Sequence, residues 1–69
     1  MSTITVIFRT GGTVNFQWHT TTPVFNTGEA QARADSLTRM GYKAEFHSTS
    51  HVAEFGVPTE YEGYVGRTV

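Results

Sequence analysis

Histidines are the residues of this sequence best suited to binding a metal ion or moving a proton. His47 and His51 lie four residues apart, a spacing that places two side chains on one face of a helix. The Ser48-Thr49-Ser50 run between them is instead typical of a turn, and His19 comes from a distant part of the chain. A zinc site built from these histidines and a nearby glutamate stays an alternative. The sequence predicts surface histidines, with no metal and no cofactor.

Covalent catalysis has little support in the sequence. The chain contains no cysteine, and none of its serines lies in the Gly-x-Ser-x-Gly pattern of a nucleophile elbow. Paired carboxylates occur only as Glu60 and Glu62, in the stretch with the least regular pattern. A chain of 69 residues also has little depth in which to shield a reacting centre from water. The sequence therefore predicts a protein that is not an enzyme.

The charge balance does not favour nucleic acid as a partner. Six acidic residues against five basic ones give a formal net charge of -1, whereas binding to phosphate backbones usually needs a strongly positive surface. Gly11-Gly12 joins two expected strands rather than opening a helix, so it makes no phosphate loop. The chain has no apolar run of about 18 residues and no signal-peptide pattern at its start, so we expect a cytoplasmic protein without membrane contact.

The start of the chain predicts a β-hairpin, because two alternating runs of β-branched and aromatic residues flank a Gly-Gly-Thr sequence. A three-residue loop at that sequence pairs Phe8 with Phe16 and Val6 with Trp18. This register places the large apolar side chains on one face. The opposite face is then mostly polar and open to solvent or to a partner. It carries Ile7, Arg9, Asn15, Gln17 and His19.

Capping signals predict a helix over residues 27–40. Asn26 and Glu29 have the spacing of a capping box, and Gly41 is placed for a left-handed end. Phe25, just before the cap, is placed to form a hydrophobic staple with an alanine in the helix. The outer face carries two acid-to-base pairs at a spacing of four, which favours ion pairing. These pairs are Glu29 with Arg33 and Asp35 with Arg39.

The inner face of this helix is narrow and made of small side chains, so the helix can approach a sheet closely. It consists of Ala30, Ala34, Leu37 and Gly41, with Met40 and the stem of Arg33 at its edge. We expect the bulk at the interface to come from the aromatic residues of the sheet. These are Phe8, Phe16 and Trp18.

Residues 42–47 alternate again and predict a third strand, with Tyr42, Ala44 and Phe46 facing inward. This strand most simply lies antiparallel beside the first, in the spatial order 2-1-3, and a parallel pairing with the second is the alternative. Residues 51–56 predict a short fourth strand, and residues 57–69 an extended or flexible arm. The predicted fold is a single α+β domain over residues 1–69, ββαβ(β), with one helix packed on an antiparallel sheet of three to four strands.

Three stretches follow one layout, a hairpin, then a helix, then a Gly-Tyr-x-Ala strand. They are Phe8-Arg9-Thr10-Gly11-Gly12-Thr13, Asn15-Phe16-Gln17-Trp18-His19, and Glu29-Ala30 through to Arg39-Met40-Gly41-Tyr42-Lys43-Ala44. This layout resembles small uncharacterised proteins encoded by bacteriophages and prophages, over about residues 4–46. The resemblance carries no activity over to any position. It implies a small accessory protein in the host cytoplasm that binds a host enzyme or defence complex, as anti-CRISPR proteins do.

We therefore expect a non-enzymatic protein-binding module that engages a protein partner or a second copy of itself. One candidate surface is the open sheet face described above. The other is the acidic, aromatic C-terminal stretch, because tyrosine offers a large contact area and carboxylates steer toward basic surfaces. It contains Glu60, Tyr61, Glu62 and Tyr64. Aromatic rings packed against the sheet are the alternative for this stretch. Weak nucleic-acid binding and the histidine metal site are the alternative functions.

Overall fold

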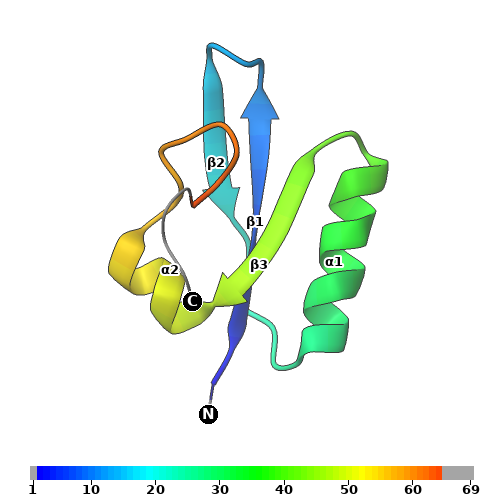
Figure 1. Ribbon diagram of the computed structural model, residues 1–69. Helices are drawn as coiled ribbons and strands as arrows, with labels where there is room; N and C mark the ends of the chain where they lie inside the picture. The colour runs from blue at the N-terminus through cyan, green and yellow to red at the C-terminus, as the bar shows by residue number, and fades with distance from the viewer. Residues whose placement is uncertain (1, 65–69) are drawn as a thin grey trace.

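The computed structural model describes residues 2–64 and shows a three-stranded antiparallel sheet with two helices (Figure 1). The elements are β1 (Ile4–Gly11), β2 (Phe16–Thr20), α1 (Thr27–Arg39), β3 (Lys43–Ser48) and α2 (Thr49–Phe55). The strand order is β2-β1-β3, and β3 runs antiparallel to β1. The predicted α+β class and the 2-1-3 order are confirmed. No helix among residues 2–64 is long and apolar enough to cross a membrane.

The register of the hairpin differs from the predicted one. Phe8 pairs with His19 and Arg9 pairs with Trp18, so the partner of Trp18 is three positions further along β1 than expected. The loop spans residues 12–15 and is closed by a hydrogen bond from the Gly12 amide to the Asn15 carbonyl at 2.9 Å. Because side chains alternate along a strand, an odd shift moves every β2 side chain to the other face of the sheet.

Gly11 explains why the longer loop is possible. It has a φ of 92°, and a Cβ built on it would lie 2.2 Å from the Asn15 carbonyl oxygen. Only glycine tolerates both the positive φ and this close approach. Gly11 is therefore the last residue of β1, whereas the predicted three-residue loop began at this residue.

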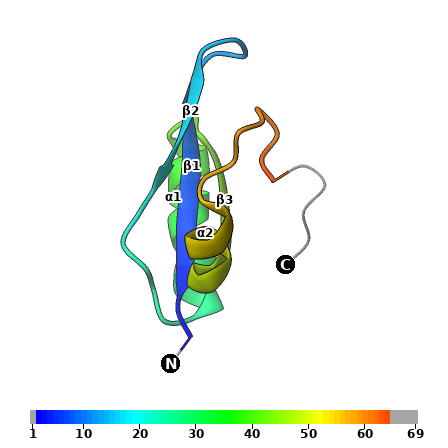
Figure 2. The same cartoon turned by 90° about the vertical axis from the view of Figure 1, so that its left-hand side faces the viewer.

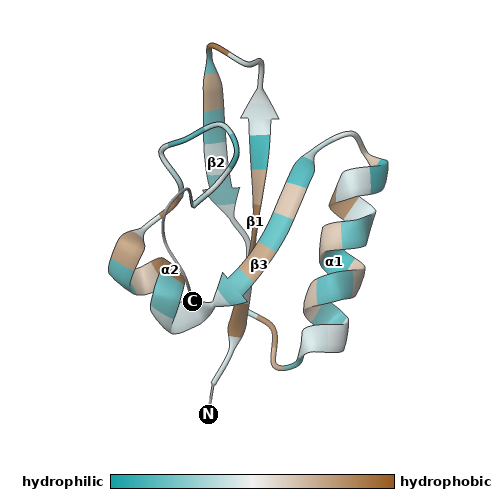
Figure 3. Ribbon diagram, in the orientation of Figure 1, coloured by the Kyte–Doolittle hydropathy of each residue, from teal (hydrophilic) through white to brown (hydrophobic). Residues whose placement is uncertain are grey.

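The core lies between α1 and the sheet. It consists of the buried residues Val6, Val24, Ala30 and Ala34, packed against Ile4, Leu37, Ala44 and Phe46. The alanine face predicted for the helix is confirmed, as is the inward direction of Ala44 and Phe46. The bulk comes from Val6, Val24 and Phe46, so the expectation that Phe8, Phe16 and Trp18 supply it is wrong. Phe8 packs against His19 and Tyr42, and the shifted register turns Phe16 and Trp18 away from α1. Figure 3 shows polar and apolar residues alternating along β3 and around α1.

The N-cap and the glycine end of α1 form as predicted, with only the Asn26 half of the capping box among the described hydrogen bonds, but the expected side-chain pairs do not form. The Asn26 side chain accepts a hydrogen bond from the Glu29 amide at 2.8 Å, and Gly41 has a φ of 98°. Phe25 is 71% exposed, so it forms no staple, and the preceding Val24 is buried in its place. Neither expected ion pair forms among residues 2–64: Arg33 donates to the Thr22 carbonyl and Asp35 accepts from Gln31.

The expected fourth strand is a helix. The Ser48 hydroxyl accepts a hydrogen bond from the His51 amide at 3.1 Å, so the Ser-Thr-Ser run caps α2 rather than forming a turn between strands. Gly56, with a φ of 72°, ends the helix. α2 packs on the face of the sheet opposite α1, where the Thr5 and Thr49 hydroxyls lie 2.9 Å apart. Figure 2 shows the chain after α2 rising along one side of the sheet. The expected arm is described as far as Tyr64, and residues 65–69 lie outside the described residues.

Candidate functional site

The five residues expected on an open sheet face do not share one surface. Ile7 is fully buried and Arg9 is half-buried, both on the face that α2 and residues 57–64 cover. Gln17 and His19 face the α1 side, where the His19 ring lies 5.2 Å from that of Phe8. Asn15 belongs to the hairpin loop. The prediction of one open face is wrong because it depended on the three-residue loop.

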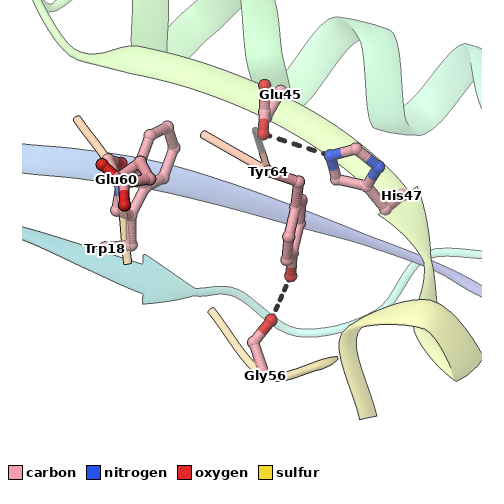
Figure 4. A network of polar contacts seen from close by, with 6 residues as sticks. All are labelled: Trp18, Glu45, His47, Gly56, Glu60 and Tyr64. Atoms are coloured by element: carbon pink, nitrogen blue, oxygen red, sulfur yellow. Dashed lines mark hydrogen bonds and ion pairs between the residues drawn. The ribbon is translucent and has the colours of Figure 1, made fainter. Parts of the chain in front are cut away.

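Residues 60–61 close the face that was expected to be open. The Trp18 indole Nε1 donates to the Glu60 carbonyl at 3.0 Å, and the Arg9 guanidinium lies 3.5 Å from the centre of the Tyr61 ring. Arg9 Nη1 also donates to the Tyr61 carbonyl at 2.5 Å, and Tyr61 meets Phe16 edge-on. Figure 4 shows Trp18 beside Glu60. The Tyr61 side chain and carbonyl therefore make contacts within the protein, with Arg9 and Phe16.

Two histidines meet under the end of this arm. The His47 and His51 rings stack with centroids 5.1 Å apart, and Tyr64 meets each of them edge-on at 4.7 Å. His47 Nε2 lies 3.1 Å from a Glu45 carboxylate oxygen, and the Tyr64 hydroxyl donates to the Gly56 carbonyl (Figure 4). This arrangement fastens the arm to α2 and β3.

The histidine cluster does not have the make-up of a metal site. His51 is 6% exposed, so the prediction of a surface histidine is wrong at this position, and its Nε2 has no hydrogen-bond partner within residues 2–64. His19 lies on the other face of the sheet. Within the described part of the chain, no group of three or more His, Cys, Asp or Glu side chains is arranged to hold a metal ion. What the geometry does support is packing of aromatic rings.

The tyrosines and the glutamates of the predicted C-terminal docking stretch differ in exposure. The Tyr61 and Tyr64 rings are half-buried against the sheet and α2, as the packed alternative anticipated. Glu60 and Glu62 are exposed. A partner that docks on residues 60–64 would therefore meet the two exposed carboxylates before the half-buried tyrosine rings.

The outer edge of β2 presents main-chain groups that the sheet does not use. The Thr21 amide donates to the Val6 carbonyl at 3.0 Å, which shows that Thr21 is a hydrogen-bonded position of the ladder. Hydrogen-bonded positions alternate along an antiparallel strand, so Gln17 and His19 also point their main-chain groups at β1. The amides and carbonyls of Phe16, Trp18 and Thr20 therefore point away from the sheet.

This edge lacks the usual protection against another strand. Pairing with β1 continues without a bulge from Thr20 to Phe16, and β2 contains no charged residue and no proline. Edge strands are commonly protected by lysine, proline or a bulge. The other edge strand, β3, carries Lys43 and Glu45. The β2 edge is thus the better template for an additional strand.

A groove of about 560 Å³ lies between α1 and the end of β2. Its walls combine hydroxyl groups, two apolar side chains and one arginine: Thr20, Thr21, Thr22, Arg33, Ser36, Leu37 and Met40. The sequence suggests none of these residues as a site, because its pattern assigns Arg33 to the edge of the inner helix face and to an ion pair with Glu29. The run of three threonines before a proline was the available signal.

Comparisons with models of protein families, with curated proteins and with solved structures gave no significant match for this chain. The functional proposal therefore depends on the geometry described above.

Proposed function

We propose that this chain is a non-enzymatic protein-binding module and that it binds an extended segment of its partner as a fourth strand on β2. The observation that carries this proposal is the unprotected edge from Phe16 to Thr20. Strand addition obtains its affinity from main-chain hydrogen bonds and its selectivity from side-chain pockets beside the strand. β2 offers outward amides and carbonyls at alternate residues, and the groove beside α1 offers the pocket.

The surfaces beside β2 fit this role. Gln17 and His19 face the α1 side, and side chains of an added strand would stand next to them. On the opposite face, Phe16 and Tyr61 would border the added strand. By resemblance to phage-encoded proteins, we place the partner in the cytoplasm of a bacterial host.

Peptide selection followed by mapping of the binding site tests the proposal. A random library of short peptides is selected against the folded chain, and the bound complex is examined by ¹⁵N-resolved NMR. Strand addition predicts that the amides of Phe16, Trp18 and Thr20 shift most and become protected from hydrogen exchange. Binding elsewhere, or no binding, would contradict the proposal.

Thr20→Pro provides a variant that blocks the edge, and Thr20→Ala is its control. The Thr20 amide points outward, so proline there removes a donor for the partner without removing a bond to β1. We expect Thr20→Pro to abolish binding of the selected peptides and Thr20→Ala to retain it. Circular dichroism of both variants checks that the fold is kept.

A further inference from the structure

Among the described residues that line the groove beside β2, Arg33 is the only charged one. Its Nη1 donates to the Thr22 carbonyl at 2.7 Å, which holds the guanidinium at the end of β2. Within residues 2–64 it has no carboxylate at ion-pair distance, including Glu29, its expected partner. A guanidinium carries several donors arranged to bind a carboxylate in a bidentate manner. Most of these donors are therefore available to a ligand in the groove.

The groove lies on the side of the sheet toward which an added strand would direct alternate side chains. Thr21 faces α1, because its partner position on β1 is the buried core residue Val6. A residue of the added strand beside Thr21 would face α1 as well. Its side chain would enter the groove next to Arg33.

We propose that the segment bound by β2 is acidic at this position: an Asp or Glu beside Thr21 pairs with Arg33. This inference rests on the proposed strand addition and specifies its partner. Hydroxyl groups of the groove, including that of Ser36, supply further donors for the carboxylate.

The apolar part of the groove specifies a second position. Leu37 is four residues after Arg33, which corresponds to about 6 Å along a helix. Residues on the same face of a strand are about 6.7 Å apart, and α1 and β2 are both roughly upright in Figure 1. An apolar residue two positions from the acid would thus lie beside His19, on the side of the sheet where Leu37 and the 64% exposed Met40 line the groove.

Charge distinguishes this partner from a second copy of the chain. β2 has the sequence Phe-Gln-Trp-His-Thr, so pairing of β2 with its copy would bring no carboxylate to Arg33. A nucleic acid is also less suitable, because the described lining of the groove contains a single cation and the chain has a net charge of -1. The observations therefore favour an acidic protein segment.

The test repeats the peptide selection with wild-type protein and with Arg33→Gln, using Arg39→Gln as the control. Arg39 belongs to the same helix but does not line the groove. We expect wild type and Arg39→Gln to select peptides with an acid and an apolar residue two positions apart, and Arg33→Gln to lose the preference for the acid. A selected peptide and its Glu→Gln counterpart are then titrated against each protein. Wild type should bind the acidic form about 10- to 100-fold more tightly, and Arg33→Gln should bind both alike.

The outcomes separate this inference from the function beneath it. If peptides bind at β2 and Thr20→Pro abolishes binding, but Arg33→Gln keeps the acid preference or wild type has none, the acidic partner is wrong and strand addition stands. If no selected peptide is sensitive to Thr20→Pro, both are wrong. Light scattering that shows a dimer abolished by Thr20→Pro would assign the edge to a second copy. Arg33→Lys, which keeps the charge, should retain part of the preference and excludes loss of folding as the cause.

Discussion

Arg9 lies directly opposite Trp18 in the β1–β2 ladder, and its guanidinium carbon is 5.9 Å from the centre of the indole ring. The same guanidinium stacks on Tyr61, and the indole donates to the Glu60 carbonyl. This pair thus fastens residues 60–61 to the sheet. The closed face that results leaves the β2 edge and the α1 groove as the surfaces best suited to a partner.

Replacing Trp18 should release the C-terminal arm. Trp18 is 4% exposed, so Trp18→Ala is expected to lower the free energy of unfolding by about 3–5 kcal/mol, and Trp18→Phe by about 1–3 kcal/mol through loss of the indole donor. Urea denaturation measures both, with the exposed Gln17→Ala as control. Protease cleavage near Tyr61 should increase in Trp18→Phe while α1 amides keep their protection. Equal loss of protection in α1 would contradict the observed register.

Gly63 should be sensitive to the addition of a single methyl group. It has a φ of 109°, and a Cβ built there would lie 2.8 Å from a Glu45 carboxylate oxygen. Gly63→Ala should cost about 1–2 kcal/mol of unfolding free energy, because a residue with a Cβ is strained at positive φ. In Gly12→Ala the new Cβ meets no atom of residues 2–64 within 4 Å, and we expect a much smaller change. Thermal melts compare the two, and equal losses would argue against an ordered arm at Gly63.

His51→Phe should not destabilise the protein. His51 is buried among rings, and its Nε2 has no hydrogen-bond partner within residues 2–64. Removing a buried, unpaired polar group recovers a penalty of about 1–3 kcal/mol, which offsets the cost of fitting a slightly larger ring. We expect an unfolding free energy equal to that of wild type or higher by about 1 kcal/mol. A clear loss of stability would show that the imidazole nitrogen has a partner and would reopen a metal-binding role.

Local signals in the sequence were sufficient to predict most of the fold. The Asn26 cap, the glycine after α1 and the alternation over residues 42–47 each depend on neighbouring residues, and the strand order then follows from short connections. Local signals are not sufficient at Ser48. A serine that opens a Ser-Thr-Ser run fits a turn between strands as well as a helix cap, and the helix is selected by its packing on β3 and β1.

The register and the site depended on distant parts of the chain. Two registers of β2 differ in which face receives Phe16 and Trp18, and the observed one is stable because residues 60–61 cover that face. The sequence around residues 60–61 shows no hydrophobic periodicity, so it does not predict where these residues lie. The position of the Arg33 side chain could not be predicted either, because nothing in the sequence indicates that Arg33 contacts Thr22, 11 residues earlier.

Amide hydrogen exchange along β2, with and without a selected peptide, tests the central claim most directly. In the free protein, the outward amides of Phe16, Trp18 and Thr20 should exchange rapidly, while those of Gln17, His19 and Thr21 should be protected by β1. With peptide bound, the outward amides should become protected too. Protection of Trp18 and Thr20 in the free monomer, or their continued rapid exchange in the complex, would contradict strand addition at β2.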